Sequence, residues 1–190
     1  MGFFSTIKRI FTGGDAAHKA LIRELKGLPK DKLPEASGAG LHNLCLKYAT
    51  TFVHEELNKP DSPFKNSHKS NFLQEMVIVN YWIVDKVLAC KKKIIMEHLH
   101  NNYFKSFHVK DVEIEKNRLL NDRYAIYHQN WDDDIGDHKE FGLKVAENIY
   151  GEGKEYPGEI ASCWIIFYTD STIKKFENLR SALKSAKIKV

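Results

Sequence analysis

Carboxylates and histidines occur in two places at spacings that could hold a metal ion. Glu97 and His100 form a Glu-x-x-His pair, which places both side chains on adjacent turns of one helix, as carboxylate-bridged di-iron bundles require. Such sites need two of these pairs and two further carboxylates, and the sequence contains no second Glu-x-x-His. The ligand set is therefore incomplete, and we expect no metal at Glu97 and His100.

The second cluster lies between His128 and His138, where four aspartates, including Asp134, would offer oxygen ligands to a hard cation. Counted from Asp132, glycine falls at the fifth position rather than at the sixth that an EF-hand requires, and no glutamate closes the loop. We interpret the stretch as an acidic turn ahead of a helix N-terminus, which the helix dipole favours. The sequence thus predicts no metal and no cofactor.

Arg123 and His128 are separated by four residues on a predicted helix of an all-α domain. This spacing resembles the active-site motif of HEPN-type ribonucleases. The resemblance implies that Arg123 and His128 would act on the phosphate and the 2′-hydroxyl of RNA. It covers six residues, and a match this short is expected by chance in a sequence of this composition. A ribonuclease therefore stands as an alternative beside a metal-dependent helical enzyme.

Asp85 lies in the middle of the most apolar predicted helix. An unpaired buried carboxylate costs several kcal/mol, so we expect Asp85 to have a partner such as Arg123, Lys86 or a tyrosine hydroxyl, or to face water. The functional alternative is a carboxylate at the floor of a pocket, with a perturbed pKa. The catalytic candidates are accordingly Asp85, Arg123 and His128.

The composition is that of a globular protein with a mildly basic surface. The 190 residues carry a net charge of +4, and 24 of the 29 basic residues are lysines spread along the chain. Nucleic-acid binders tend to cluster their basic residues, so we do not expect a nucleic-acid partner. The three cysteines, Cys45, Cys90 and Cys163, are widely spaced, which is typical of a reducing compartment. With no apolar run of membrane-spanning length and no secretory signal, the sequence predicts a cytoplasmic protein.

Residues 1–12 form a predicted amphipathic helix, followed by a flexible Gly13-Gly14 joint. Its apolar residues share one face of the helical wheel: Phe3, Phe4, Ile7, Ile10 and Phe11. Two interpretations stay open. The segment packs on the rest of the chain, or it lies at a membrane surface with Lys8 and Arg9 near the headgroups. We treat residues 1–14 as an N-terminal arm and residues 15–190 as a single helical domain.

The predicted fold is an all-α bundle of about six helices around a buried central helix, residues 71–100. Apolar residues nearly surround this helix, which is typical of a core position. The β-branched run 77–84 could instead be a buried strand, but both flanks favour helix and contain no glycine or proline. We also expect one helix to begin at Ser37 or Gly38, another to begin at Asp111, and the last helix to bend or restart near Thr169–Thr172.

None of the catalytic patterns in the sequence is complete. We therefore predict a non-catalytic interaction or regulatory protein that acts through a helical surface. Its partner would be another protein or a second copy of the chain. A weak contact with a membrane surface through residues 1–12 is a further alternative.

Overall fold

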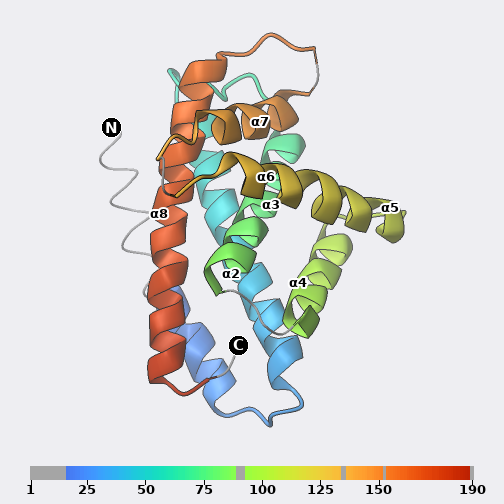
Figure 1. Cartoon of the computed structure of the whole chain (residues 1–190), viewed down its shortest axis with the longest axis vertical. Helices are drawn as coiled ribbons and strands as arrows, with labels where there is room; N and C mark the ends of the chain where they lie inside the picture. Colours follow the sequence, from blue (N-terminus) through green and yellow to red (C-terminus); the bar gives the residue numbers. More distant parts are fainter. Residues whose placement is uncertain (1–15, 89–92, 134–135, 152, 189–190) are drawn as a thin grey trace.

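The chain folds into an elongated bundle of helices, in which the first and the last long helix run along the length of the molecule (Figure 1). The computed structural model describes residues 16–88, 93–133, 136–151 and 153–188. A helix spans residues 16–26, and the further helices are α2 (Leu33–Leu57), α3 (Lys69–Leu88), α4 (Lys93–Ser106), α5 (Val112–Asn117), the π-helix η1 (Arg118–Tyr124), α6 (Ala125–Asn130), α7 (Lys139–Tyr150) and α8 (Gly158–Ser185). Within these ranges there is no β-strand, so the predicted all-α class is confirmed.

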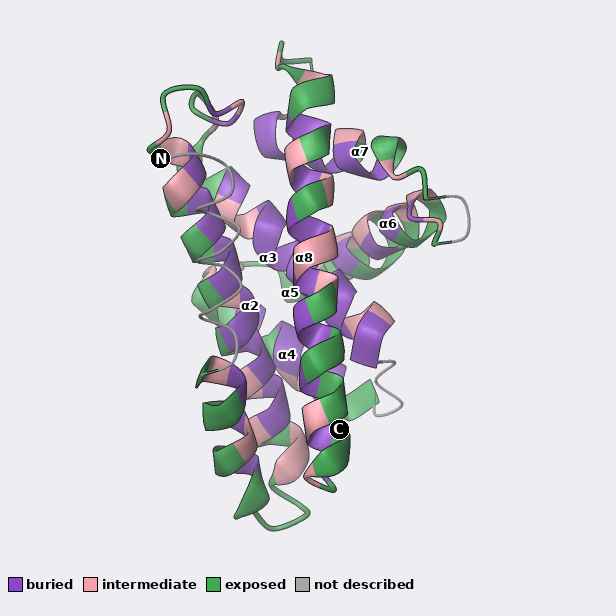
Figure 2. Cartoon of the chain, turned by 90° about the vertical axis from the view of Figure 1, so that its left-hand side faces the viewer, coloured by how far each residue is buried: buried purple, intermediate pink, exposed green. Residues whose placement is uncertain are grey.

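Helix α3 is the core of the bundle, because α2, α7 and α8 pack around it. All eight apolar residues between Met76 and Val84 are fully buried, and Figure 2 shows α3 enclosed by its neighbours. A helix that is apolar on all sides must be covered on all sides, which is what the sequence pattern predicts. The prediction of a buried central helix is thus confirmed for the part of the chain that α3 spans.

The prediction that this helix runs from residue 71 to residue 100 is wrong. Helix α3 ends at Leu88, and α4 begins at Lys93 and packs on α2 at an angle to α3 (Figure 1). The reason lies in the packing of α2 on α4: a Cβ atom at Gly38 would lie only 3.0 Å from the backbone oxygen of Ile95 and from the backbone nitrogen of Leu99. The two helices therefore lie almost backbone to backbone at Gly38. This contact is long-range, so the local pattern of residues 71–100 does not predict it.

Three further predictions concern helix ends, of which two are wrong and one is confirmed. Helix α2 begins at Leu33 rather than at Ser37 or Gly38, because Pro34 is tolerated in the first turn of a helix. Helix α8 continues without interruption through Thr169 and Thr172, which are both buried inside the bundle. By contrast, the predicted helix start at Asp111 is confirmed, since its side chain accepts a hydrogen bond of 3.1 Å from the backbone of Ile114.

The helical run that follows Asp111 contains the most unusual backbone of the described chain. Its middle segment, η1, is a π-helix of seven residues between α5 and α6. Such segments are rare and occur often at functional sites. The run crosses α3, and Figure 1 shows α5 at the outer tip of the molecule.

Two predictions concern contact with a membrane. The predicted amphipathic segment 1–12 lies outside the described residues. Among the helices that are described, none is both long and apolar enough to cross a membrane.

Candidate functional site

The three predicted catalytic residues lie along one interface, where α3 meets the run from α5 to α6. Asp85 and His128 pair with each other, whereas Arg123 pairs with a different acid. The Nε2 atom of His128 is 3.5 Å from a carboxylate oxygen of Asp85. The Nε atom of Arg123 is 3.5 Å from a carboxylate oxygen of Glu75. Asp85 and Glu75 are ten residues apart on α3, so they are separated by about 15 Å along the helix axis. Arg123 and His128 therefore meet different carboxylates and do not converge on one cleft.

Glu75 is the centre of a buried polar cluster that sequence reasoning missed. Its carboxylate accepts a hydrogen bond from the hydroxyl of Tyr127 and another, of 3.0 Å, from the side-chain amide of Asn148. Burial raises the pKa of Glu75, and the nearby charge of Arg123 offsets this only in part. The only sequence signal for Glu75 is that it is an acid among apolar residues of a helix. Asp85 gives the same signal and is the candidate that the sequence predicts instead.

A second acid–base pair lies next to this cluster. Arg118, on η1, holds Glu115 with two parallel hydrogen bonds, of 2.8 Å and 2.5 Å. Burial on its own would raise the pKa of Glu115, but the hydrogen bonds and charge of Arg118 outweigh it and lower that pKa. The hydroxyl of Tyr103 donates a third hydrogen bond, of 3.0 Å, to the same carboxylate. Each arginine of the π-helix is thus engaged by a carboxylate.

His100, on α4, contacts the π-helix η1 through Tyr124. It is buried, and its Nε2 atom is 2.9 Å from the hydroxyl of Tyr124. Burial, and to a lesser degree the charge of Lys116, lowers the pKa of His100 to about 4. The imidazole is therefore neutral over the ordinary pH range and serves as a hydrogen-bonding group of the core.

Asp85 and His128 are the more accessible pair, with side chains 39% and 46% exposed. The imidazole of His128 also packs edge-on against Trp82, with ring centroids 5.7 Å apart. A carboxylate beside an imidazole can orient the ring for proton transfer. However, Asp85 lies at the edge of the core rather than at the floor of a pocket, and its partner is His128 rather than Arg123.

The proposed metal ligands do not come together. Glu97 is exposed, whereas His100 is buried against Tyr124, so the two side chains of the Glu-x-x-His pair face different surroundings. His138 stacks on Trp131 with ring centroids 3.8 Å apart, and Asp134 lies outside the described residues. Within the ranges that the structure describes, no group of three histidine, cysteine or acidic side chains could hold a metal ion.

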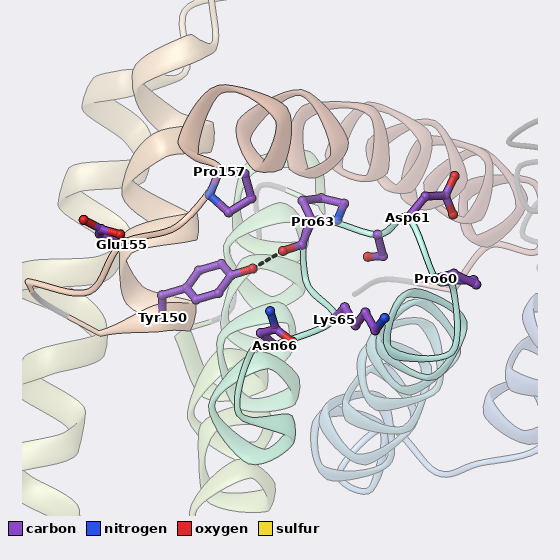
Figure 3. Close-up of a pocket in the computed structure, with 9 residues that line it drawn as sticks. Pro60, Asp61, Pro63, Lys65, Asn66, Tyr150, Glu155 and Pro157 are labelled. Atoms are coloured by element: carbon purple, nitrogen blue, oxygen red, sulfur yellow. Dashed lines mark hydrogen bonds between the residues drawn. The ribbon is translucent and has the colours of Figure 1, made fainter.

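A pocket of about 310 Å³ lies between the loop after α2 and the loop before α8 (Figure 3). The hydroxyl of Tyr150 donates a hydrogen bond to the backbone oxygen of Pro63 across it, which ties the end of α7 to the loop after α2. The other charged and polar residues of its wall are Asp61, Ser62, Lys65, Asn66 and Glu155. This mixed wall contains none of the residues singled out in the sequence, and it offers neither a histidine nor a cysteine for chemistry.

An apolar stripe on the outer face of α8 was also missed. Ile160, Cys163, Trp164 and Phe167 follow one another at helical spacings of three and four residues, so they share one side of the helix. Ile160 is 58% exposed and Phe167 is 55% exposed, although both are large and apolar. The signal was present in the sequence as a run of apolar residues, but the same run also supplies the buried face of α8.

Comparison of the chain with protein-family models, with curated proteins and with solved structures gives no match.

Proposed function

We propose that this protein is a non-catalytic interaction protein that binds an amphipathic helix of a partner protein through the apolar stripe of α8, defined by Ile160, Cys163, Trp164 and Phe167. The observation that carries the proposal is the exposure of Ile160 and Phe167 at the two ends of this stripe. Large apolar side chains that recur on one exposed helix face are the usual mark of an interaction surface.

The shape of the stripe favours a helix as the partner. Its residues occupy positions i, i+3, i+4 and i+7, the pattern of an amphipathic helix that packs one side on a neighbour, and they form a short apolar seam. From Ile160 to Phe167 the seam is about 11 Å long, or two helical turns. An amphipathic helix with apolar residues at the same spacings would bury this seam, with its polar face left in water.

Trp164 is held in place at the middle of the seam. The ammonium group of Lys59 lies 4.7 Å from the centroid of its ring, and Lys59 is itself paired with Glu56 at 2.5 Å. An aromatic side chain that is already ordered loses less conformational freedom on binding, and tryptophan is enriched among the residues that dominate interface energetics. Trp164 is therefore the anchor of the proposed interface.

The charged groups of the α3 interface support a structural rather than a catalytic role. Glu75 is paired with Arg123, and Glu115 with Arg118, so the charges compensate one another. Arg123, which a ribonuclease would need for the phosphate, is engaged by a buried acid.

Double substitution of the stripe tests the proposal. The variant Ile160→Ser/Phe167→Ser is compared with Val112→Ser/Ile114→Ser, which removes exposed apolar residues from α5 instead. Proteins retained from a cell extract by the wild type and by the α5 variant, but not by the α8 variant, are then produced in pure form. We expect the purified partner to bind the α8 variant at least ~10-fold more weakly than the other two proteins, since two interface side chains are lost.

Two results would contradict the proposal. One is equal affinity of the purified partner for all three proteins. The other is that the substitutions in the α8 variant abolish binding to lipid vesicles but leave binding to the protein unchanged. Circular dichroism melting of each variant separates both results from simple unfolding.

A further inference from the structure

The helix at residues 16–26 fixes the direction in which the N-terminal arm leaves the bundle. Leu21 packs against Gly40, and His18 is 2.8 Å from the hydroxyl of Tyr48, so this helix runs antiparallel to α2. Going back along the chain from His18 towards residue 16 therefore means moving towards the C-terminal end of α2.

Helix α2 is in turn antiparallel to α8. Tyr48 contacts Phe176, with ring centroids 5.9 Å apart, and Phe52 contacts Tyr168 at 4.4 Å. Just past the end of α2, Lys59 reaches the ring of Trp164. The C-terminal end of α2 thus lies beside the N-terminal half of α8, and the arm leaves the bundle in the direction of the apolar stripe.

The distances fit the length of the arm. Phe176, at the level of His18, lies nine residues from Phe167, which is about 14 Å along α8. Residues 12–15 can span up to about 13 Å, and the turn at 16–18 adds to this reach. Phe11 can therefore reach the level of Phe167. The helix predicted from Phe3 to Phe11 would be about 12 Å long, close to the length of the stripe.

We infer that the apolar face of residues 3–11 docks on the apolar stripe of α8 and occupies the partner-binding surface in the free protein. The inference rests on the proposed function, because it assumes that the stripe binds amphipathic helices. The apolar faces match in kind, since three phenylalanines and two isoleucines of the arm would meet Ile160, Trp164 and Phe167. Gly13 and Gly14 give the joint the freedom to bring the two helices together.

A docked arm regulates access to the stripe by competition. If the arm covers the stripe in ~90% of molecules, the apparent affinity for a partner helix is reduced ~10-fold. A partner that binds tightly enough displaces the arm, whose apolar face is then exposed.

Disulfide trapping in the full-length chain tests the docking, because Cys163 belongs to the stripe and is exposed. In a Cys90→Ser background, Ile7→Cys places a thiol at the centre of the apolar face of the arm. Ser5→Cys places one on the opposite face and is the matched control. Cys45 is buried and does not compete. We expect Ile7→Cys to form a disulfide with Cys163 within one chain at least ~10-fold faster than Ser5→Cys, as read from peptide mass maps of monomeric product.

Several outcomes overturn the inference. Equal rates for the two variants do so, as does a disulfide that links only two different chains, which would mean that a second copy covers the stripe. Slow trapping of Ile7→Cys, together with flotation on phosphatidylserine vesicles that requires Phe4 and Phe11, would assign the arm to a lipid surface instead.

A second measurement separates this inference from the proposed function. Phe4→Ser/Phe11→Ser should bind the purified partner ~10-fold more tightly than the wild type, because the competitor is weakened. If that affinity is unchanged while Ile160→Ser/Phe167→Ser still weakens binding, the inference fails and the proposed function stands. If neither pair of substitutions changes partner affinity, the proposed function fails as well.

Discussion

The guanidinium of Arg123 and the carboxylate of Glu75 form a buried ion pair, with Nε and Oε2 3.5 Å apart. This pair joins the π-helix to the core helix α3, and Tyr127 and Asn148 complete the hydrogen bonding of the acid. Since a buried charge is tolerated only when it is compensated, the stability of the fold should depend on this cluster.

Glu75→Ala should be strongly destabilising. The substitution leaves Tyr127 and Asn148 without their hydrogen-bond acceptor and Arg123 without its opposite charge. Removal of one partner from a buried ion pair costs about 3–5 kcal/mol. Urea unfolding followed by circular dichroism measures the change in the free energy of unfolding. Glu113→Ala, at an exposed acid on α5, is the control and should change it by less than ~0.5 kcal/mol. Similar costs for the two variants would mean that the cluster does not hold α3 to the π-helix.

His100 should make the fold sensitive to acid. Its pKa is about 4 in the folded protein against 6.5 ordinarily, so the unfolded chain takes up a proton first as the pH falls. The contribution of neutral His100 to the free energy of unfolding is therefore fully present above pH 6.5. It is lost as the pH falls from 6.5 to about 4. The full shift corresponds to about 3 kcal/mol.

Unfolding free energies of the wild type and His100→Gln, measured at several pH values across this range, check the prediction. The difference between the two proteins should narrow as the pH falls, because the variant has no imidazole to protonate. His54→Gln, on the exposed side of α2, is the control. Parallel curves for all three proteins would rule out the assigned role of His100.

Gly142→Ala should weaken the contact between α7 and α8. The added Cβ atom would lie 2.8 Å from the backbone oxygen and 2.9 Å from the Cα atom of Ser162, which is too close for either helix to keep its place. Overpacking of this kind costs typically about 1–3 kcal/mol. Gly27→Ala is the matched control, since nothing lies within 4 Å of its Cβ position. Thermal melting should show a lower midpoint only for Gly142→Ala.

Truncation of two phenylalanines of α8 should lower the free energy of unfolding by very different amounts. Phe176 is fully buried against Tyr48, so Phe176→Ala should cost about 3–5 kcal/mol through the cavity that it leaves. Phe167 is 55% exposed on the apolar stripe, and Phe167→Ala should cost less than ~1 kcal/mol. Chemical unfolding of the two variants gives the comparison. A large cost for Phe167→Ala would indicate that this side chain serves the fold rather than an interaction surface.

The sequence by itself determined the helical class and the position of the core. The unbroken apolar pattern of α3 requires burial on every side, and Asp111 marks a helix start through its own side chain. These features are local, because helix formation and capping depend on residues within one or two turns.

Tertiary structure alone decided where α3 ends and which charges meet. The close approach of α2 and α4 at Gly38 involves residues about sixty positions apart, and the pairing of Glu75 with Arg123 spans forty-eight. The acid at position 85 stood out in the sequence, yet the buried acid of α3 is Glu75, since burial depends on which helix covers each turn of α3. Spacing along a chain fixes which side chains share a helix face, but the packing of distant helices fixes what that face meets.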